Sequence, residues 1–373
     1  LEERTPEALE EARRRREMVE LLFAELMQAP PADRFGLVQQ VRFFSLDLLE
    51  RLLEQSHAGQ LADPARAAEL ARLAAHLASL FGMGEEEAAA ALPRAYCLAA
   101  NARRLEGRRR VADSLLVKAA RCLTDRLERA FYCRTLGLLR WEQGRADEAM
   151  AMLQHAACLY ASEGPEHEVG SCLTLLGLVL QEEGDPAEAL TLLGRGWAEM
   201  DRDVRPLLAL RGGLVLAFCL AQAEQTERAR HVLRESWRLF AEVPDPREVI
   251  RIYWLEGKAL ARLGDREEAI HMMESVRRQL LVEPSPAEAS LVSLDLALSL
   301  AEAGRAEEIE ALAVDLPATF PDTPAMLPAA EVVRALACPV SSEHRRREAA
   351  RATAGLRRVF RLQGPHLKPL PFA

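Results

Sequence analysis

The stretch "LVLQEEGDPAEALTLL", Leu178 to Leu193, places Gly184 between two apolar helical patterns and follows it with Asp185 and Pro186. A near copy, "ALARLGDREEAIHMM", occupies Ala259 to Met273. Glycine readily takes the left-handed backbone conformation that ends a helix, and Asp followed by Pro favours the start of the next one. Each stretch therefore predicts two helices joined by a tight turn.

The same turn recurs along the chain at a nearly constant period. The equivalent positions are spaced by 37 residues once and then by 40 residues four times, at Gly107, Gly144, Gly184, Glu224, Gly264 and Gly304. A period of this length is typical of helix pairs that stack on one another, because each pair buries its apolar faces only against its neighbours. We therefore expect an all-α solenoid of antiparallel helix pairs, with a helix A before each turn and a helix B after it.

Small residues occupy fixed positions relative to each turn. Seven residues before it lie Ala100, Gly137, Gly177, Ala217, Gly257 and Ala297. Five residues after it lie Ala112, Ala149, Ala189, Ala229 and Ala269, with the larger Ile309 in the last repeat. Twelve residues after it lie Ala119, Ala156, Gly196 and Ser236, followed by the larger Val276 and Leu316. Small side chains at such positions let two helices cross at a short distance.

This ladder of small residues resembles the tetratricopeptide repeat, which implies a right-handed superhelical solenoid. The resemblance predicts three parts: an N-terminal helical cap with a leading repeat at 1–89, the repeat array at 90–320, and a C-terminal helical cap with an extended tail at 321–373. The N-terminal cap is expected to hold amphipathic helices at Glu7–Met27 and Asp33–Ser56. The last helices are expected at Glu331–Cys338 and Glu343–Leu362.

The charge balance argues against nucleic acid as the general partner. The net charge is −9, so the chain is not expected to coat a polyanion along its length. Local basic runs at Arg13–Arg16, Arg103–Arg110 and Arg345–Arg361 are more typical of solvated helix faces than of nucleic-acid sites. The longest nearly uncharged stretch, "GGLVLAFCLAQA", is too short to cross a bilayer. No membrane partner is expected.

Nothing in the sequence predicts catalysis, a metal or a cofactor. No GxSxG, P-loop, HExxH or GxGxxG pattern occurs, and the cysteines show no ligand spacing. Unpatterned cysteines fit a reducing cytoplasm, where the chain is expected to reside. Two histidines on B helices, His155 and His231, are interpreted as half-buried packing residues. Gly212 and Gly213, side by side in an apolar helix, are interpreted as a site of close helix approach.

The resemblance implies a binding surface, because the A helices of such arrays line a concave groove. The helix-A offsets that face this groove in the family carry over to Arg94, Asn101, Arg104, Phe131, Arg134, Trp141, Thr174, Gln181, Arg211, Phe218, Arg251, Trp254 and Lys258. The set is basic and aromatic and contains no Asp or Glu. It predicts binding of an acidic peptide or protein segment. The alternative is that Phe131, Trp141 and Phe218 only pack between neighbouring helices.

Several functions are compatible with these features. The resemblance favours a non-catalytic scaffold or sensor region of a bacterial regulatory or multi-protein system, which binds another protein or a peptide. A scaffold could also bind through the outer B-helix face or through the caps. The remaining alternative is an accessory segment of an enzyme or of a DNA-binding regulator whose output domain lies outside this chain. The oligomeric state is left open.

Overall fold

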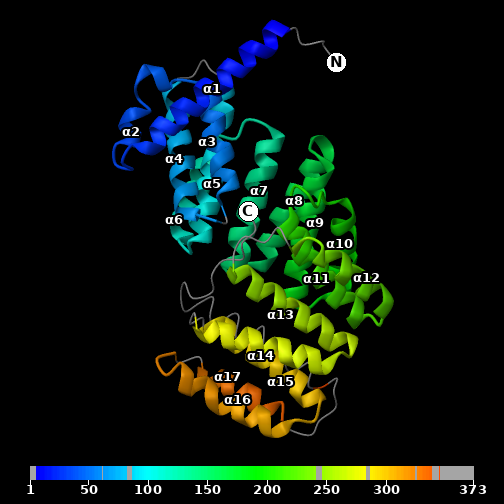
Figure 1. Ribbon diagram of the computed structural model, residues 1–373. Helices are drawn as coiled ribbons and strands as arrows, with labels where there is room; N and C mark the ends of the chain where they lie inside the picture. Colours follow the sequence, from blue (N-terminus) through cyan, green and yellow to red (C-terminus); the bar gives the residue numbers. More distant parts are fainter. Residues whose placement is uncertain are drawn as a thin grey trace. The chain divides into compact units, whose positions relative to one another are not determined.

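The computed structural model describes residues 6–60, 62–81, 86–240, 246–282, 286–323, 326–337 and 344. Throughout these ranges the regular elements are helices, α1 to α17 and one short 3-10 helix, and no strand occurs (Figure 1). The all-α prediction is therefore confirmed. Contacts group the chain into two compact units, one up to Leu139 and one from Arg140 onward.

The first unit is a stack of antiparallel helices around an aliphatic core. Its elements are α1 (Pro6–Gln28), α2 (Arg34–Leu37), the 3-10 helix (Val41–Phe43), α3 (Leu46–Ala58), α4 (Pro64–Leu80), α5 (Glu86–Leu105), α6 (Arg109–Ala120) and most of α7 (Arg126–Glu142). Leu26, Phe43, Leu52 and Leu73 are fully buried together in this core. The core joins α1, α3 and α4, so the N-terminal helices pack against one another.

The N-terminal cap departs from the sequence prediction at one place. The helix predicted at Glu7–Met27 is α1, but the single helix predicted at Asp33–Ser56 is wrong. That segment forms α2, the 3-10 helix and α3, because the chain becomes extended at Gln40 and again at Ser45. The Ser45 hydroxyl accepts a hydrogen bond from the Leu48 amide and starts α3 there.

The second unit consists of helix pairs in regular order. Its elements are α8 (Ala146–Glu163), α9 (Glu166–Glu183), α10 (Pro186–Glu199), α11 (Pro206–Gln222), α12 (Thr226–Trp237), α13 (Pro246–Leu263), α14 (Arg266–Val282), α15 (Pro286–Glu302), α16 (Ala306–Thr319) and α17 (Met326–Ala335). The A helices α9, α11, α13 and α15 contact one another in sequence, and each packs on its B partner. The helix predicted at Glu331–Cys338 belongs to α17, and the one at Glu343–Leu362 lies outside the described residues.

All six predicted turns adopt the same left-handed conformation. The five glycines have positive φ, with Gly184 at 93°, and Glu224 is at 58°. Glu224 is thus a non-glycine residue in the conformation that favours glycine. After Gly184, the Asp185 carboxylate accepts a hydrogen bond from the Glu188 amide at 3.1 Å and caps α10. The left-handed turns expected from the sequence are therefore confirmed at all six positions, and the acidic cap is confirmed at Asp185.

The small-residue ladder marks the crossings of A and B helices. A Cβ atom on Gly177 would lie 2.6 Å from Cγ of Leu193, and one on Gly196 would lie 2.6 Å from the Thr174 amide nitrogen. Ala189 is completely buried at the same crossing. Gly212 is also a site of close approach, since its Cβ would lie 2.6 Å from Cγ2 of Thr174. The predicted role of these small residues is confirmed.

Candidate functional site

The predicted groove residues all lie on A helices, but they fall into two groups. The residues from Arg94 to Arg134 belong to the first unit, on α5 and α7, and those from Trp141 onward belong to the second, on α7, α9, α11 and α13. Each group forms its own network of contacts.

In the first unit, Asn101 is the centre of a buried polar chain. Its side-chain amide donates to Oε1 of Gln60 at 3.2 Å, and its Oδ1 accepts from Nε of Arg104 at 2.9 Å. Gln60 in turn donates to the carbonyl oxygens of Ser56 at 3.1 Å and Leu98 at 3.2 Å. These bonds fix the orientation of the Asn101 amide on α5, between Arg104 of the same helix and Gln60, which follows α3.

A small pocket opens beside this chain. The first-unit pocket has a volume of about 10 Å³ and is lined by His57, Gln60, Leu98, Asn101, Phe131, Arg134, Thr135 and Leu138. The Arg134 guanidinium lies over the Phe131 ring, 5.1 Å from its centroid. A cation, two side-chain amides and an aromatic ring therefore border one pocket, and no carboxylate belongs to its lining. Arg94 lies apart from it and pairs with Glu50 at 2.6 Å.

In the second unit, the predicted cations and tryptophans contact carboxylates of the next A helix. The Arg251 guanidinium pairs with Oε1 of Glu288 at 2.6 Å, and Nζ of Lys258 lies 3.4 Å from Oδ2 of Asp295. Trp254 donates its indole N–H to the same Asp295 at 2.9 Å. We call this set, with Phe218, whose ring lies 5.3 Å from the Lys258 ammonium, the A-helix surface of the second unit.

The remaining predicted residues of this unit are more deeply placed. Trp141 is buried and donates to Glu182 at 3.0 Å. Thr174 is completely buried where α9, α10 and α11 cross, and Arg211 is also buried. Gln181 is half-buried. The burial of Trp141 and Phe218 agrees with the alternative that these side chains only pack between neighbouring helices.

The sequence analysis missed the polar partners of these residues, namely Gln60, Glu182, Glu288 and Asp295. The offsets that give the groove positions compare residues within one repeat, whereas the partners lie in a neighbouring repeat, the preceding one for Asn101 and the next one for Trp141, Arg251, Trp254 and Lys258. The spacing of 41 residues occurs in three of the hydrogen bonds, Gln60–Asn101, Trp141–Glu182 and Trp254–Asp295. A search for polar residues at this spacing would have found them.

The described residues offer no obvious reactive centre. Among them, no group of three or more His, Cys, Asp or Glu side chains is placed to hold a metal ion. Burial raises the pKa of the Cys133 thiol to about 11 and of the Cys219 thiol to about 12, so both are poor nucleophiles near neutral pH. His155 and His231, expected to be half-buried, are exposed instead. None of the described helices has the length and apolar character needed to cross a bilayer.

Comparison with known proteins agrees with this architecture. Residues 126–196, which cover α7 to most of α10, match the tetratricopeptide repeat family. Residues 126–196 are therefore of tetratricopeptide-repeat type. The match confirms the resemblance inferred from the ladder of small residues. No curated protein matches the sequence significantly.

Two solved structures share the fold over most of their length. A Rap protein complexed with competence and sporulation factor is 12% identical, with a TM-score of 0.58 over 86% of this chain and 98% of that one. The apo form of RapI is 11% identical, with a TM-score of 0.51 over 81% of this chain and 85% of that one. At these identities the likeness concerns the fold.

Proposed function

We propose that this chain is a protein-binding module of a regulatory or multi-protein system, and that it binds an acidic peptide segment of its partner through its A helices. The observation that carries the proposal is the first-unit pocket. There the Arg134 guanidinium, the amides of Gln60 and Asn101 and the Phe131 ring border one opening. A carboxylate suits the cation, and a neighbouring apolar side chain suits the ring. At about 10 Å³ the opening itself admits only a water-sized group, so the peptide would lie across it.

The A-helix surface of the second unit supports the same chemistry. Its cations already hold carboxylates, those of Glu288 and Asp295, at hydrogen-bonding or ion-pair distance. An acidic ligand would have to compete with these internal carboxylates for the two cations. We assign the main acidic contact to the first-unit pocket, because no carboxylate belongs to its lining. A protein of similar fold, the Rap protein, has been crystallised with competence and sporulation factor.

The proposal is a binding function without catalysis. It places the chain in the cytoplasm, in keeping with the free thiols of the six described cysteines. Acidic peptides would be attracted to the pocket even though the whole chain is negative, because a cation in a concave site focuses the local field. Binding should therefore weaken as salt is added.

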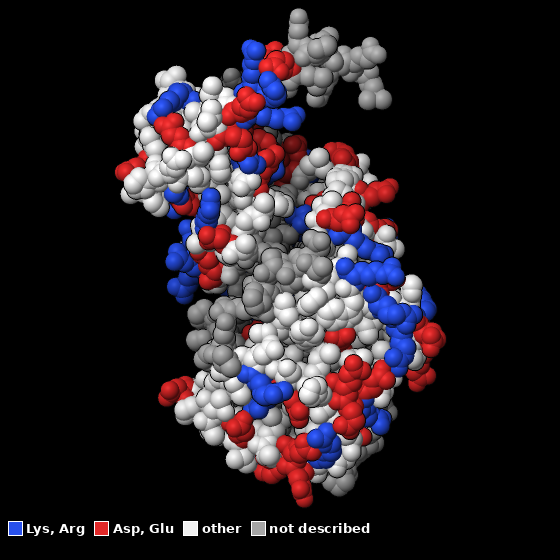
Figure 2. All heavy atoms as spheres, in the orientation of Figure 1, with Lys and Arg blue, Asp and Glu red and all other residues white. Residues whose placement is uncertain are grey.

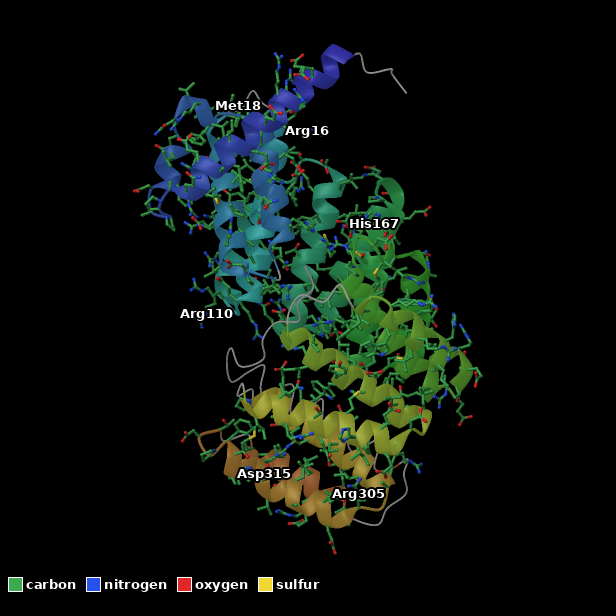
Figure 3. All side chains as sticks on the ribbon, viewed as in Figure 1. Arg16, Met18, Arg110, His167, Arg305 and Asp315 are labelled. Atoms are coloured by element: carbon green, nitrogen blue, oxygen red, sulfur yellow. The ribbon has the colours of Figure 1, made fainter. Side chains whose placement is uncertain are left out.

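A peptide-display selection tests this function. The wild-type chain should enrich acid-rich sequences that also carry an apolar residue, and the double variant Asn101→Ala with Arg134→Ala should lose that enrichment. Arg110→Ala is the matched control, because this exposed arginine of the same unit projects away from its helices (Figure 3). Circular dichroism verifies that each variant is folded. Enrichment of basic peptides, or the same acidic peptides selected by the double variant, would rule the proposal out.

A further inference from the structure

Two glycines of α10 have opposite surroundings, although they are only two residues apart. A Cβ on Gly196 would collide with the Thr174 backbone, so the crossing of α9 and α10 requires glycine there. A Cβ on Gly194 would meet no atom within 4 Å. Glycine inside a helix lowers helix stability relative to alanine, and no packing contact explains it at Gly194. Its effect is to leave open the space beside α10.

That space is a pocket among α10, α11 and α12, which we call the B-helix pocket. Its volume is about 470 Å³, enough to admit a large apolar side chain. The apolar part of its lining comes from Leu190 on α10, Leu216 and Leu220 on α11, and Val232 on α12. Because the side chains of all three helices border it, the pocket belongs to the second unit alone and does not involve the A-helix surface.

The polar part of the lining is basic. Arg195 of α10 and Arg228 and His231 of α12 are exposed at this pocket, and no Asp or Glu belongs to the lining. Arg228 donates to the side-chain oxygen of Gln225, which carries no charge, whereas Nε of Arg195 pairs with Glu199, outside the lining, at 2.7 Å. Arg228 is therefore the main cation for an incoming carboxylate. Arg234, further along α12, and Arg238, directly after it, are also exposed. Figure 2 shows Lys and Arg gathered over α12.

From this combination we infer that the B-helix pocket is a second protein-binding site, which takes a large apolar side chain from an acidic segment of a partner protein. The apolar floor desolvates the anchor side chain, and the basic rim pairs with carboxylates on either side of it. The inference concerns a site on the B helices and does not depend on the function proposed for the A helices.

A nucleic acid fits this pocket less well than a protein segment. Bases bind proteins by stacking on accessible aromatic rings, and the lining has only two rings, the Trp197 indole and the exposed His231 imidazole. The Arg202 guanidinium lies 3.8 Å from the centroid of that ring, and the indole N–H is bonded to the Ala209 carbonyl. Trp197 is therefore occupied by internal contacts, and the aliphatic floor favours an aliphatic or aromatic side chain.

Gly194→Leu tests the inference directly, because the leucine side chain would fill the pocket from a position with room for a Cβ. The probes are short fluorescent peptides in which one Leu or Phe is flanked by Asp and Glu. Matched peptides replace that residue with Ala or the flanks with Lys, and a single-stranded oligonucleotide serves as the polyanion. We expect the acidic apolar peptide to bind the wild-type chain, and Gly194→Leu to weaken it by about tenfold or more, as for loss of a buried anchor contact.

Charge reversal provides the second measurement. Arg228→Glu at the pocket should weaken the binding of the acidic apolar peptide strongly, whereas Arg238→Glu, directly after the same helix and outside the lining, should have a smaller effect. Thermal melting verifies that all variants fold. The inference is overturned if no acidic apolar peptide binds, if folded Gly194→Leu binds it as well as the wild-type chain, or if the oligonucleotide binds in its place. If binding survives Gly194→Leu but is lost with Asn101→Ala and Arg134→Ala, the B-helix pocket is refuted while the proposed function stands.

Discussion

Trp254 and Asp295, which lie 41 residues apart on neighbouring A helices, are joined by an indole-to-carboxylate hydrogen bond of 2.9 Å. Trp141 and Glu182 repeat both the chemistry and the spacing. The repeat length is 40 residues, so each donor lies against the position one residue beyond its equivalent in the next repeat. Arg251 contacts Glu288, which lies 37 residues further along the chain. The spacings of 37 and 41 differ by four residues, about one helical turn, so both reach the same face of the next A helix.

Asp295→Ala should destabilise the second unit, because it removes a carboxylate that serves both Trp254 and Lys258. Both charged side chains of the Lys258–Asp295 pair are about 15% exposed. Leaving buried donors without their acceptor is expected to cost about 1–3 kcal/mol in the free energy of unfolding. Chemical denaturation measures this loss. Glu310→Ala, which breaks the exposed pair with Arg334, is the control and should change stability by about 1 kcal/mol or less.

Glu224→Gly should stabilise the chain. At φ 58° a side chain with a Cβ is strained by roughly 1–2 kcal/mol, and glycine removes that strain. Glycine also makes the unfolded chain more flexible, so the expected net gain is about 0.5–1 kcal/mol. A rise in melting temperature checks this. Gln222→Gly, at the end of the preceding helix, is the control and should lower it; an unchanged or lower melting temperature for Glu224→Gly would contradict the expected strain.

The sequence was sufficient for the class of fold and for the turns, because both depend on local rules. Even Glu224 could be assigned to a turn, since the period of 40 residues outweighs the missing glycine. The break at Ser45 could not be assigned in the same way. Apolar residues continue through Asp33–Ser56, and only the capping bond from the Leu48 amide shows where α3 begins.

The binding residues were less predictable than the fold. The family offsets select positions on A helices but say nothing about what lies opposite them in the next repeat, so the carboxylates of Glu288 and Asp295 were not anticipated. The two glycines of α10 illustrate the same limit. Gly196 belongs to the ladder of small residues, whereas the space beside Gly194 depends on how three helices diverge.

Gly196→Ala and Gly194→Ala should have opposite effects on stability. The methyl group at position 196 would press on the Thr174 backbone, and overpacking of this kind costs typically 1–3 kcal/mol. The methyl group at position 194 meets open space, so the higher helix propensity of alanine should raise stability by about 0.5–1 kcal/mol. Urea denaturation of the two variants compares them directly. Equal effects of the same sign would show that the α9–α10 crossing is wrongly placed.

Glu256→Gln should remove a pH dependence from the stability of the chain. Burial raises the pKa of Glu256 from 4.5 to about 7, with a smaller contribution from the nearby Glu268, although the hydrogen bond from Trp237 at 2.6 Å lowers it. The folded chain therefore binds this proton more tightly than the unfolded chain. The stability that it contributes is fully present below pH 4.5 and is lost as the pH rises through 7.

Melting curves over that pH range measure the effect. A glutamine at position 256 still offers an oxygen to the Trp237 indole but has no proton to lose. The melting temperature of the variant relative to the wild-type chain should rise between pH 4.5 and 7 and then level off. Glu267→Gln, at an exposed carboxyl on α14, is the control and should not reproduce this rise. A constant difference between Glu256→Gln and the wild-type chain would show that Glu256 titrates normally.

Glu288→Gln should strengthen the binding of acidic peptides if the A-helix surface of the second unit contributes to the proposed function. Arg251 and Glu288 form a pair whose side chains are each about 14% exposed, so the Glu288 carboxylate competes with any incoming one. Glutamine retains an oxygen for the guanidinium but removes the negative charge, which leaves a net positive site. Titration of an acidic peptide selected by the wild-type chain should give a lower Kd for the variant, and added salt should reduce the difference. Glu310→Gln, which neutralises an exposed carboxylate on α16, controls for net charge alone. If both variants improve binding equally, the effect is one of overall charge, and the acidic contact is confined to the first-unit pocket.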